Sequence, residues 1–318
     1  MEIHISCELN SGNARKFADD LYKNRDADSL SINISELKFV YPFSTLFLLS
    51  AIWSAVDYRK SKNLLPTQIT YNKGNLSNTY LGYFGFFKQL GIDFGNKVCS
   101  QQGSTFIPIS EIKFKTIENE SIERKIPIQE IIQERAESLV KIILPHTKYE
   151  NEEDQLLSYS LREIIRNCFE HGSARSCYIM GQRWSNGYAE LAILDRGIGI
   201  KNALQKKFPI KDNKTALNLA ISPGISSGNI NSQDYYANSG FGLYITSELC
   251  KRYGVFVLCS SDGMLTINRD GSPSYVETPP LGTIVRLRMN INNGEYFPNV
   301  KQLIIQEGEK NCHDGNRQ

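Results

Sequence analysis

The chain has no apolar run long enough to cross a membrane and no pair of cysteines at metal-binding spacing. The most apolar stretch, Thr45–Val56, is shorter than the roughly 18 residues of a spanning helix and is interrupted by Ser. The seven cysteines are scattered without a C-x-x-C pair, which argues against a structural zinc site or a disulfide framework. Glu2 and His4 open an alternating, strand-like segment, so we expect no signal peptide. These features predict a protein of the reducing cytoplasm.

The chain also lacks a strong excess of either charge. Its 36 Lys and Arg residues nearly balance 34 Asp and Glu, giving a net charge of +2 over 318 residues. Such a balance gives no strong attraction for nucleic acid or for a membrane surface, so we expect neither as a partner. We expect protein partners instead, including ones encoded nearby. The length suggests about two domains.

The most informative segment is Leu161–Gly172, with the sequence LREIIRNCFEHG. Its apolar residues fit one face of a helix, whereas Glu163, Asn167 and His171 fall at i, i+4 and i+8 on the opposite stripe. That stripe is roughly 12 Å long, enough to span a polyphosphate and its metal, and Gly172 is predicted to cap the helix. Taken alone, the stripe would more simply be the solvated face of an amphipathic helix.

A second motif follows two predicted strands, residues 176–184 and 187–194. The second strand runs into Asp195-Arg-Gly-Ile-Gly199. Glycines at alternate positions let the backbone approach a flat ligand, and an Asp at the strand end can accept hydrogen bonds from an exocyclic amine. Alone this motif is weak, because Asp and Gly are also common turn residues.

Further along, a polar segment from Lys201 leads to Gly240-Phe241-Gly242-Leu243 and a predicted helix that ends at Gly254. A glycine-rich turn at a helix N-terminus favours a phosphate, although it could also be a flexible entry to the helix. Three more strands are predicted in the sequences VFVLCSS, GMLTIN and, from Gly282, GTIVRLRM.

Taken together, residues 120–292 resemble the ATP-binding domain of the GHKL family, which includes gyrase, heat-shock chaperones, sensor histidine kinases and MutL. Four motifs carry the resemblance in the family's order. They are the N-box with Glu163, Asn167 and His171; the D-x-G-x-G box with Asp195, Gly197 and Gly199; the G-x-G-L box with Gly240, Phe241, Gly242 and Leu243; and the G-T box with Gly282 and Thr283.

The resemblance implies a Bergerat-type α/β sandwich that binds ATP and Mg²⁺. It implies that Asn167 ligates Mg²⁺, that Glu163 acts as the general base, and that Asp195 contacts the adenine amino group. It further implies that Thr283 lies near the adenine and that His171 touches phosphate or only packs. The resemblance also implies that Gly240 and Gly242 contact the phosphates, under a mobile lid formed by residues 201–239.

The form of the N-box is most similar to that of anti-sigma-factor serine kinases. Histidine autokinase activity is disfavoured, because Pro145 directly before His146 spoils a regular helical phosphoacceptor site. Two functions therefore stay open. The first is an ATPase or a Ser/Thr protein kinase that acts on a partner. The second is a nucleotide-gated switch with little turnover.

The first hundred residues predict a small α/β domain from alternating strands at 30–34 and 68–71 and helices at 45–58 and 76–90. The run SINISELKFVYPFSTLFLLSAI is similar to the core of STAS domains, but Pro42 stands at the family's phosphorylated position. Ser44 and Thr45 nearby could be phosphorylation targets, and we favour the interpretation that they cap the following helix. This degenerate STAS-like domain is expected to be an interaction module or an internal regulator. The aromatic residues at 80–87 could form a partner surface, and we favour the interpretation that they pack in the core.

These assignments divide the chain into an N-terminal domain (1–112), a charged linker (113–128), an ATP-binding domain (129–295) and a polar tail (296–318). The segment 129–144 has helical periodicity. It could dock on the ATP-binding domain or form a homodimer contact.

Overall fold

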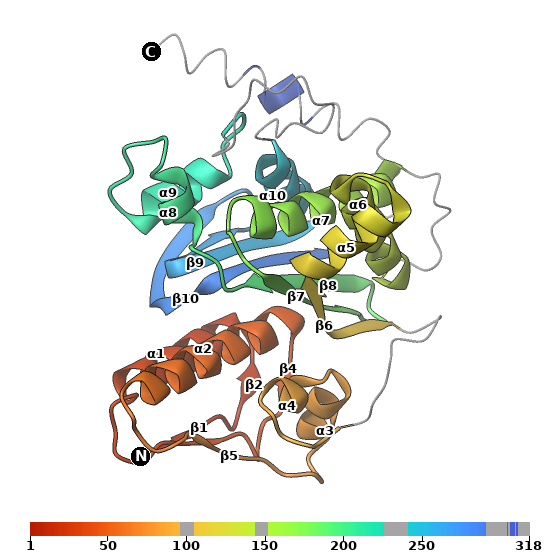
Figure 1. Ribbon diagram of the computed structural model, residues 1–318. Coiled ribbons are helices and arrows are strands. Elements are labelled where there is room, and N and C mark those ends of the chain that lie inside the picture. The colour runs from red at the N-terminus through yellow and green to blue at the C-terminus, as the bar shows by residue number, and fades with distance from the viewer. Residues whose placement is uncertain are drawn as a thin grey trace.

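The computed structural model of this chain is a mixed α/β protein built on one large sheet (Figure 1). It describes residues 1–95, 105–143, 152–225, 241–290, 304, 306–308 and 310. The sheet has five strands in the order β6-β7-β8-β10-β9, and every neighbouring pair is antiparallel. The strands are β6 (Phe106–Lys113), β7 (Ser176–Arg183), β8 (Tyr188–Asp195), β9 (Gly254–Ile267) and β10 (Pro273–Asn290).

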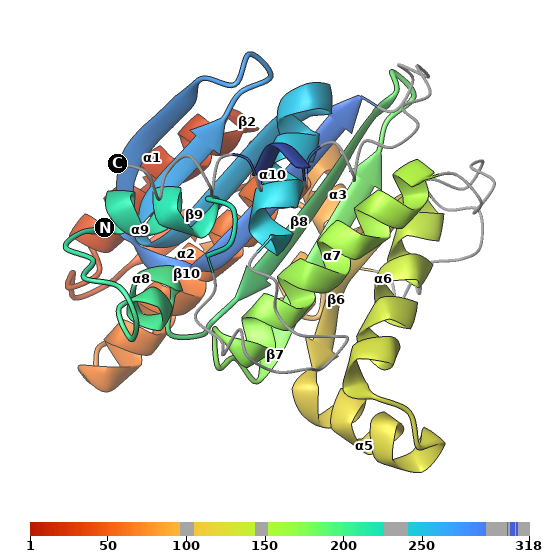
Figure 2. The same cartoon turned by 90° about the horizontal axis from the view of Figure 1, so that it is seen from above.

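Helices cover one face of this sheet (Figure 2). They are α6 (Ile128–Ile143), α7 (Glu152–Glu170) and α10 (Gly242–Tyr253). On β8, Leu191 and Ile193 belong to the core on this side, whereas Ala192 and Leu194 belong to the core on the other side. This is the alternation that a strand imposes. Because β8 is apolar on both faces, the sheet has to be covered on both sides.

Residues 1–95, called the N-terminal unit below, provide the second cover. Three short parallel strands form a sheet in the order β1-β3-β5, and β2 pairs with β4. The strands are β1 (Glu2–His4), β2 (Glu8–Leu9), β3 (Ser31–Asn33), β4 (Phe39–Val40) and β5 (Gln68–Thr70). The helices are α1 (Ser11–Lys23), α2 (Pro42–Ser61), α3 (Leu76–Tyr83) and α4 (Phe86–Gln89).

Helices α1 and α2 lie between the small sheet and the five-stranded sheet (Figure 1). The central position of α2 explains why its sequence is apolar on nearly every side, because a helix buried all round needs no polar face. One continuous apolar cluster includes Phe43 and Phe47 of α2 together with Leu194 and Val257 of the large sheet. The N-terminal unit is therefore packed directly onto the sheet.

The segment expected to be a linker, 113–128, contains helix α5 (Phe114–Arg124). Ion pairs of Arg124 with Glu134 and of Glu120 with Arg135 join α5 to α6. The expected boundary after residue 112 lies at the end of β6, which pairs with β7 and is an edge strand of the large sheet.

The expected cap of α2 by Ser44 or Thr45 is wrong as well. The N-cap residue is Tyr41, Pro42 stands in the first turn, and both Ser44 and Thr45 are buried inside the helix. Proline suits this position for two reasons: its fixed φ matches the first helical turn, and an N–H there would have no acceptor within the helix. The carboxylate of Glu190 takes the capping role by accepting a hydrogen bond from the N–H of Phe43 (2.9 Å).

Several boundaries differ from the sequence prediction. The helix expected at 76–90 is divided into α3 and α4 at Gly85, which has a left-handed φ of 79°. The strands expected at 255–261 and 263–268 are one strand, β9, and β10 begins nine residues before Gly282. The polar segment after Lys201 contains two short helices, α8 (Ile200–Leu204) and α9 (Asn213–Ala220).

Other expectations are confirmed, fully or in part. Helix α6 matches the predicted segment 129–144. Of the aromatic residues at 80–87, Phe84, Phe86 and Phe87 are buried as predicted, whereas Tyr83 is exposed. Within the described ranges, no helix has both the length and the apolar character of a membrane span. The expectations for His146, Gly240 and most of the tail at 296–318 fall outside the described residues.

Candidate functional site

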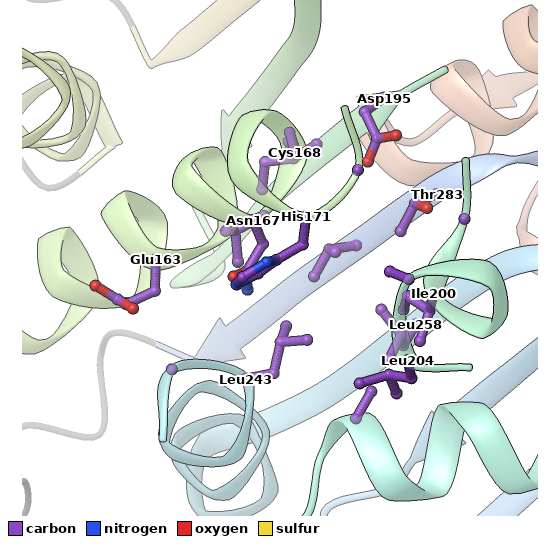
Figure 3. Close-up of a pocket in the computed structure, with 18 of the residues that line it drawn as sticks. Glu163, Asn167, Cys168, His171, Asp195, Ile200, Leu204, Leu243, Leu258 and Thr283 are labelled. Atoms are coloured by element: carbon purple, nitrogen blue, oxygen red, sulfur yellow. The ribbon is translucent and has the colours of Figure 1, made fainter. Parts of the chain in front are cut away.

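A pocket between α7, α10, the α8–α9 segment and the sheet collects residues from all four sequence motifs (Figure 3). Its empty space amounts to about 860 Å³, counting the open mouth. The predicted site residues that line it are Glu163, Asn167, His171, Asp195, Gly199, Gly242, Leu243 and Thr283. Glu163 and Thr283 are 120 residues apart in the sequence, so only the folded sheet brings them together.

The polar side chains follow a definite order along the pocket (Figure 3). Asp195 and Thr283 lie at one end, Asn167 and His171 point into the middle, and Glu163 lies at the other end. Opposite them is an apolar wall that includes Ile200, Leu204, Leu243 and Leu258. The pocket therefore has a polar side along α7 and the end of β8, and an apolar side opposite.

Asp195 ends the central strand β8 and is 3% exposed. Burial raises the pKa of its carboxyl to about 6, although hydrogen bonds from the Gly197 N–H (2.7 Å) and the Cys168 thiol oppose that rise. Its strand neighbours are Cys177 on β7 and Thr283 on β10. A buried carboxylate with a raised pKa inside a cleft is a typical feature of a binding site.

The loop after Asp195 is held against the end of α7. The N–H of Ile198 donates to the carbonyl oxygen of Gly172 (2.8 Å), and a Cβ atom on Gly197 would overlap that same oxygen. The expected cap at Gly172 needs correction, because the left-handed residue is Ser173, with a φ of 53°. Gly172 instead allows a close approach, since a Cβ atom there would lie 2.6 Å from the carbonyl oxygen of Cys168. Gly172 and Gly197 thus allow the first two motifs to pack in direct contact.

A buried serine that the sequence did not single out joins two more parts of the site. The Ser260 hydroxyl on β9 accepts a hydrogen bond from the N–H of Ile200 (2.9 Å) and lies 3.1 Å from the Thr283 hydroxyl. Ser260 therefore holds the start of α8 beside Thr283. Its place in an apolar strand gave no signal, because an inward-facing Ser in such a run usually only fills space.

His171 is half-buried near the end of α7, and its pKa is lowered mainly by this burial. The positive charges of Arg166 and Lys207 lower its pKa further, whereas Glu170 and Glu163 oppose them. The imidazole is therefore neutral at pH 7 and can donate or accept a hydrogen bond in the pocket. Asn167, one turn earlier, adds a neutral amide beside it.

Glu163 stands at the junction of α7 and α10. A Cβ atom on Gly242 would lie 2.8 Å from the Cβ atom of Glu163, so glycine lets the start of α10 pack on α7. The Glu163 carboxylate accepts hydrogen bonds from Arg162 (2.8 Å) and Arg166 (3.3 Å). Neither arginine was singled out from the sequence. Both guanidinium groups therefore hold the carboxylate at this end of the pocket.

Two other predicted site residues lie beside the pocket. Gly197 packs on Gly172 behind the lining, and Phe241 precedes α10 with its ring 6.1 Å from that of Tyr244. The sequence also did not single out Cys168, which lines the pocket and donates to Asp195. The helical pattern of the sequence places Cys168 on the apolar face of α7.

Among the residues described here, no three His, Cys, Asp or Glu side chains gather as a metal site. A divalent cation in this pocket would therefore need oxygen ligands from the bound molecule in addition to Asn167. Compared with known proteins, the chain matches no protein-family model and no curated sequence.

Proposed function

We propose that this chain is an ATP·Mg²⁺-binding regulatory protein of the GHKL class, with a Bergerat-type ATP-binding domain. The observation that carries the proposal is the convergence of four motifs on one pocket, with the buried carboxylate of Asp195 at one end. The order of the groups fits the shape of the ligand. Adenine would lie beside Asp195 and Thr283, and the phosphates would run along Asn167 toward Glu163.

The residues present fit this nucleotide and its metal. The ionised Asp195 carboxylate is an acceptor for the adenine amino group, and the apolar wall with Leu204 and Leu258 suits the faces of a purine. The start of α10 at Gly242 offers a helix N-terminus to the phosphates. Asn167 would hold Mg²⁺ with phosphate oxygens completing its coordination. Bound Mg²⁺ neutralises developing negative charge during phosphoryl transfer.

Two activities remain candidates for this site. In the first, the protein hydrolyses ATP or phosphorylates a Ser or Thr of a partner, with Glu163 orienting the water or hydroxyl that attacks. In the second, ATP binding gates a partner surface with little turnover. The ion pairs with Arg162 and Arg166 already engage the Glu163 carboxylate and turn it toward α7, which favours the second activity.

The N-terminal unit is proposed to be a STAS-like interaction module. Supporting this are its parallel strands with flanking helices and the presence of Pro42 where a phosphorylatable residue would stand. A proline has no hydroxyl to phosphorylate, so the unit would act by contact. Its partners are proposed to be proteins, including ones encoded nearby.

The test uses γ-labelled ATP and Mg²⁺ with purified protein, alone and with proteins encoded beside it. Bound nucleotide, free phosphate and labelled protein are followed for the parent, for Glu163→Gln and for the control Glu170→Gln. Glu170 also pairs with Arg166 on α7 but does not line the pocket. Turnover lost only in Glu163→Gln supports an enzyme, whereas tight binding without turnover supports the switch. A parent that binds no nucleotide contradicts the proposal.

A further inference from the structure

Helix α2 of the N-terminal unit contacts Arg196, in the loop after Asp195, and Gly282, in β10, from behind the sheet. Three of its residues, Ser50, Trp53 and Asp57, make these contacts. Their spacing of three and four residues puts them on one face of the helix. None of them lines the pocket, so their effect on it must pass through other residues.

Trp53 and Asp57 hold the loop that follows Asp195. Arg196, the next residue, forms an ion pair with Asp57, and its guanidinium lies 5.3 Å from the centre of the Trp53 ring. The Trp53 indole is itself fixed, because its N–H donates to the carbonyl of Gln89 (3.1 Å) and its ring lies 4.9 Å from that of Tyr178. Arg196 is therefore held by an already ordered aromatic ring.

Ser50 contacts strand β10 beside the site. Its hydroxyl accepts a long hydrogen bond from the N–H of Gly282 (3.4 Å). A Cβ atom on Gly282 would overlap the carbonyl oxygen of Asp195, so this part of β10 and the end of β8 are in direct contact. Residue 283 is the strand partner of Asp195. One helix face thus supports the loop after Asp195 and the adjoining part of β10 at the adenine end of the pocket.

The helix is held firmly in the N-terminal unit. Near its C-terminus, Arg59 is 1% exposed and donates to the carbonyl oxygens of Arg25, Ala27, Asp28 and Leu65. At its N-terminus, Glu190 of β8 accepts from Phe43 and ties α2 to the large sheet as well. A shift of the N-terminal unit relative to that sheet would therefore act on the contacts of α2.

We propose that Ser50, Trp53 and Asp57 are positioning residues of the nucleotide site, through which the N-terminal unit and the nucleotide pocket control each other. This inference rests on the proposed function. A partner that shifts α2 changes the affinity for ATP, and by thermodynamic linkage bound ATP changes the affinity for that partner by the same factor. It gives the N-terminal unit a defined regulatory role.

The first test uses the tryptophans as reporters, because the chain has only two. In Trp184→Phe, Trp53 is the sole tryptophan. In Trp53→Phe the sole tryptophan is Trp184, which follows β7 at the end remote from Cys177, the strand partner of Asp195. Titration with ATP and Mg²⁺ is expected to change the emission of Trp53 and leave that of Trp184 unchanged. Saturable ATP binding without a change at Trp53 would overturn the inference.

The second test measures ATP affinity by calorimetry in Trp53→Ala and in the milder surface change Asp57→Asn. We expect a loss of roughly 5-fold or more for Trp53→Ala and a smaller loss for Asp57→Asn, because exposed ion pairs contribute little. The control is Asp19→Asn, which breaks a comparable ion pair with Arg15 on α1 and should bind like the parent.

If Trp53→Ala does not fold, Asp57→Asn and the Trp53 titration still decide the question. Parent-like affinity in Asp57→Asn, together with unchanged Trp53 emission, overturns the inference while leaving ATP binding intact. A parent protein that binds no ATP overturns the proposed function, and this inference with it. The two failures are therefore distinguishable.

Discussion

The carboxylate of Glu190 in the middle of β8 accepts a hydrogen bond from the backbone N–H of Phe43, which lies 147 residues earlier at the start of α2. The same carboxylate is fully buried and pairs with Arg286 on β10 (2.8 Å). One side chain of the large sheet therefore caps a helix of the N-terminal unit and balances a largely buried cation. This explains why α2 has no capping side chain of its own.

Replacing Glu190 should destabilise the whole molecule. We expect Glu190→Ala to lower the free energy of unfolding by about 3 kcal/mol, because Arg286 and the Phe43 N–H both lose a buried partner. Glu190→Gln keeps an acceptor for the N–H and should cost less. Urea denaturation measures both variants. If Glu190→Ala proved as stable as the parent, Glu190 would have no role in joining the N-terminal unit to the large sheet.

Asp195 should reduce stability in the range of pH where it is ionised. Its pKa of about 6 lies above the value of about 4 expected in an unfolded chain, so the folded protein binds this proton more tightly. Stability therefore falls as the pH rises from about 4 to 6 and then stays low. We expect Asp195→Asn to be more stable than the parent at pH 7.5, by roughly 1 to 3 kcal/mol.

That gain should shrink as the pH falls below 6, because the parent carboxyl is then protonated in the folded state. Urea denaturation at pH 7.5 and pH 4.5 provides the comparison. An equal gain at both values of pH would show that the effect of the substitution is not due to ionisation.

Gly197 should be needed for the site, although it does not line the pocket. In Gly197→Ala the new methyl group would overlap the carbonyl oxygen of Gly172, which would separate the loop after Asp195 from the end of α7. We expect ATP affinity to fall at least 10-fold, because a misplaced Asp195 loses its hydrogen bond to the ligand. Calorimetry measures this change.

The matched control is Gly12→Ala. A Cβ atom at Gly12 meets only the side-chain oxygen of Asn10, at an ordinary 3.5 Å. Its ATP affinity should equal that of the parent. If Gly197→Ala also bound like the parent, the interlock between the loop and α7 would be irrelevant to binding.

The sequence predicted the elements around the pocket well because their patterns are local. The stripe of Glu163, Asn167 and His171 depends only on helical spacing, and the position of Asp195 depends on the end of a strand. The pocket residues from different motifs could be grouped only through the family resemblance. Spacing alone does not say that Thr283 pairs with Asp195.

Contacts between distant segments could not be predicted. The cap of α2 comes from the distant Glu190, whereas the local sequence favours Ser44 and Thr45, which lie within the helix. The charged stretch at 113–128 has the sequence character of a linker, because helix α5 lacks a strongly apolar face. Its ion pairs with α6 join separate segments and leave no local pattern. Ser260 gave no local signal, since its two hydrogen bonds reach residues 60 and 23 positions away.

The most direct test of the central claim compares the binding of ATP and inosine triphosphate, with Mg²⁺, to the parent and to Asp195→Ala. Inosine carries a carbonyl oxygen where adenosine carries an amino group. Asp195 would accept a hydrogen bond from that amino group. The parent should bind ATP roughly 10-fold or more tightly than inosine triphosphate, and Asp195→Ala should lose that preference. Equal binding of both nucleotides by the parent, or an unchanged preference in Asp195→Ala, would contradict an adenine site at Asp195.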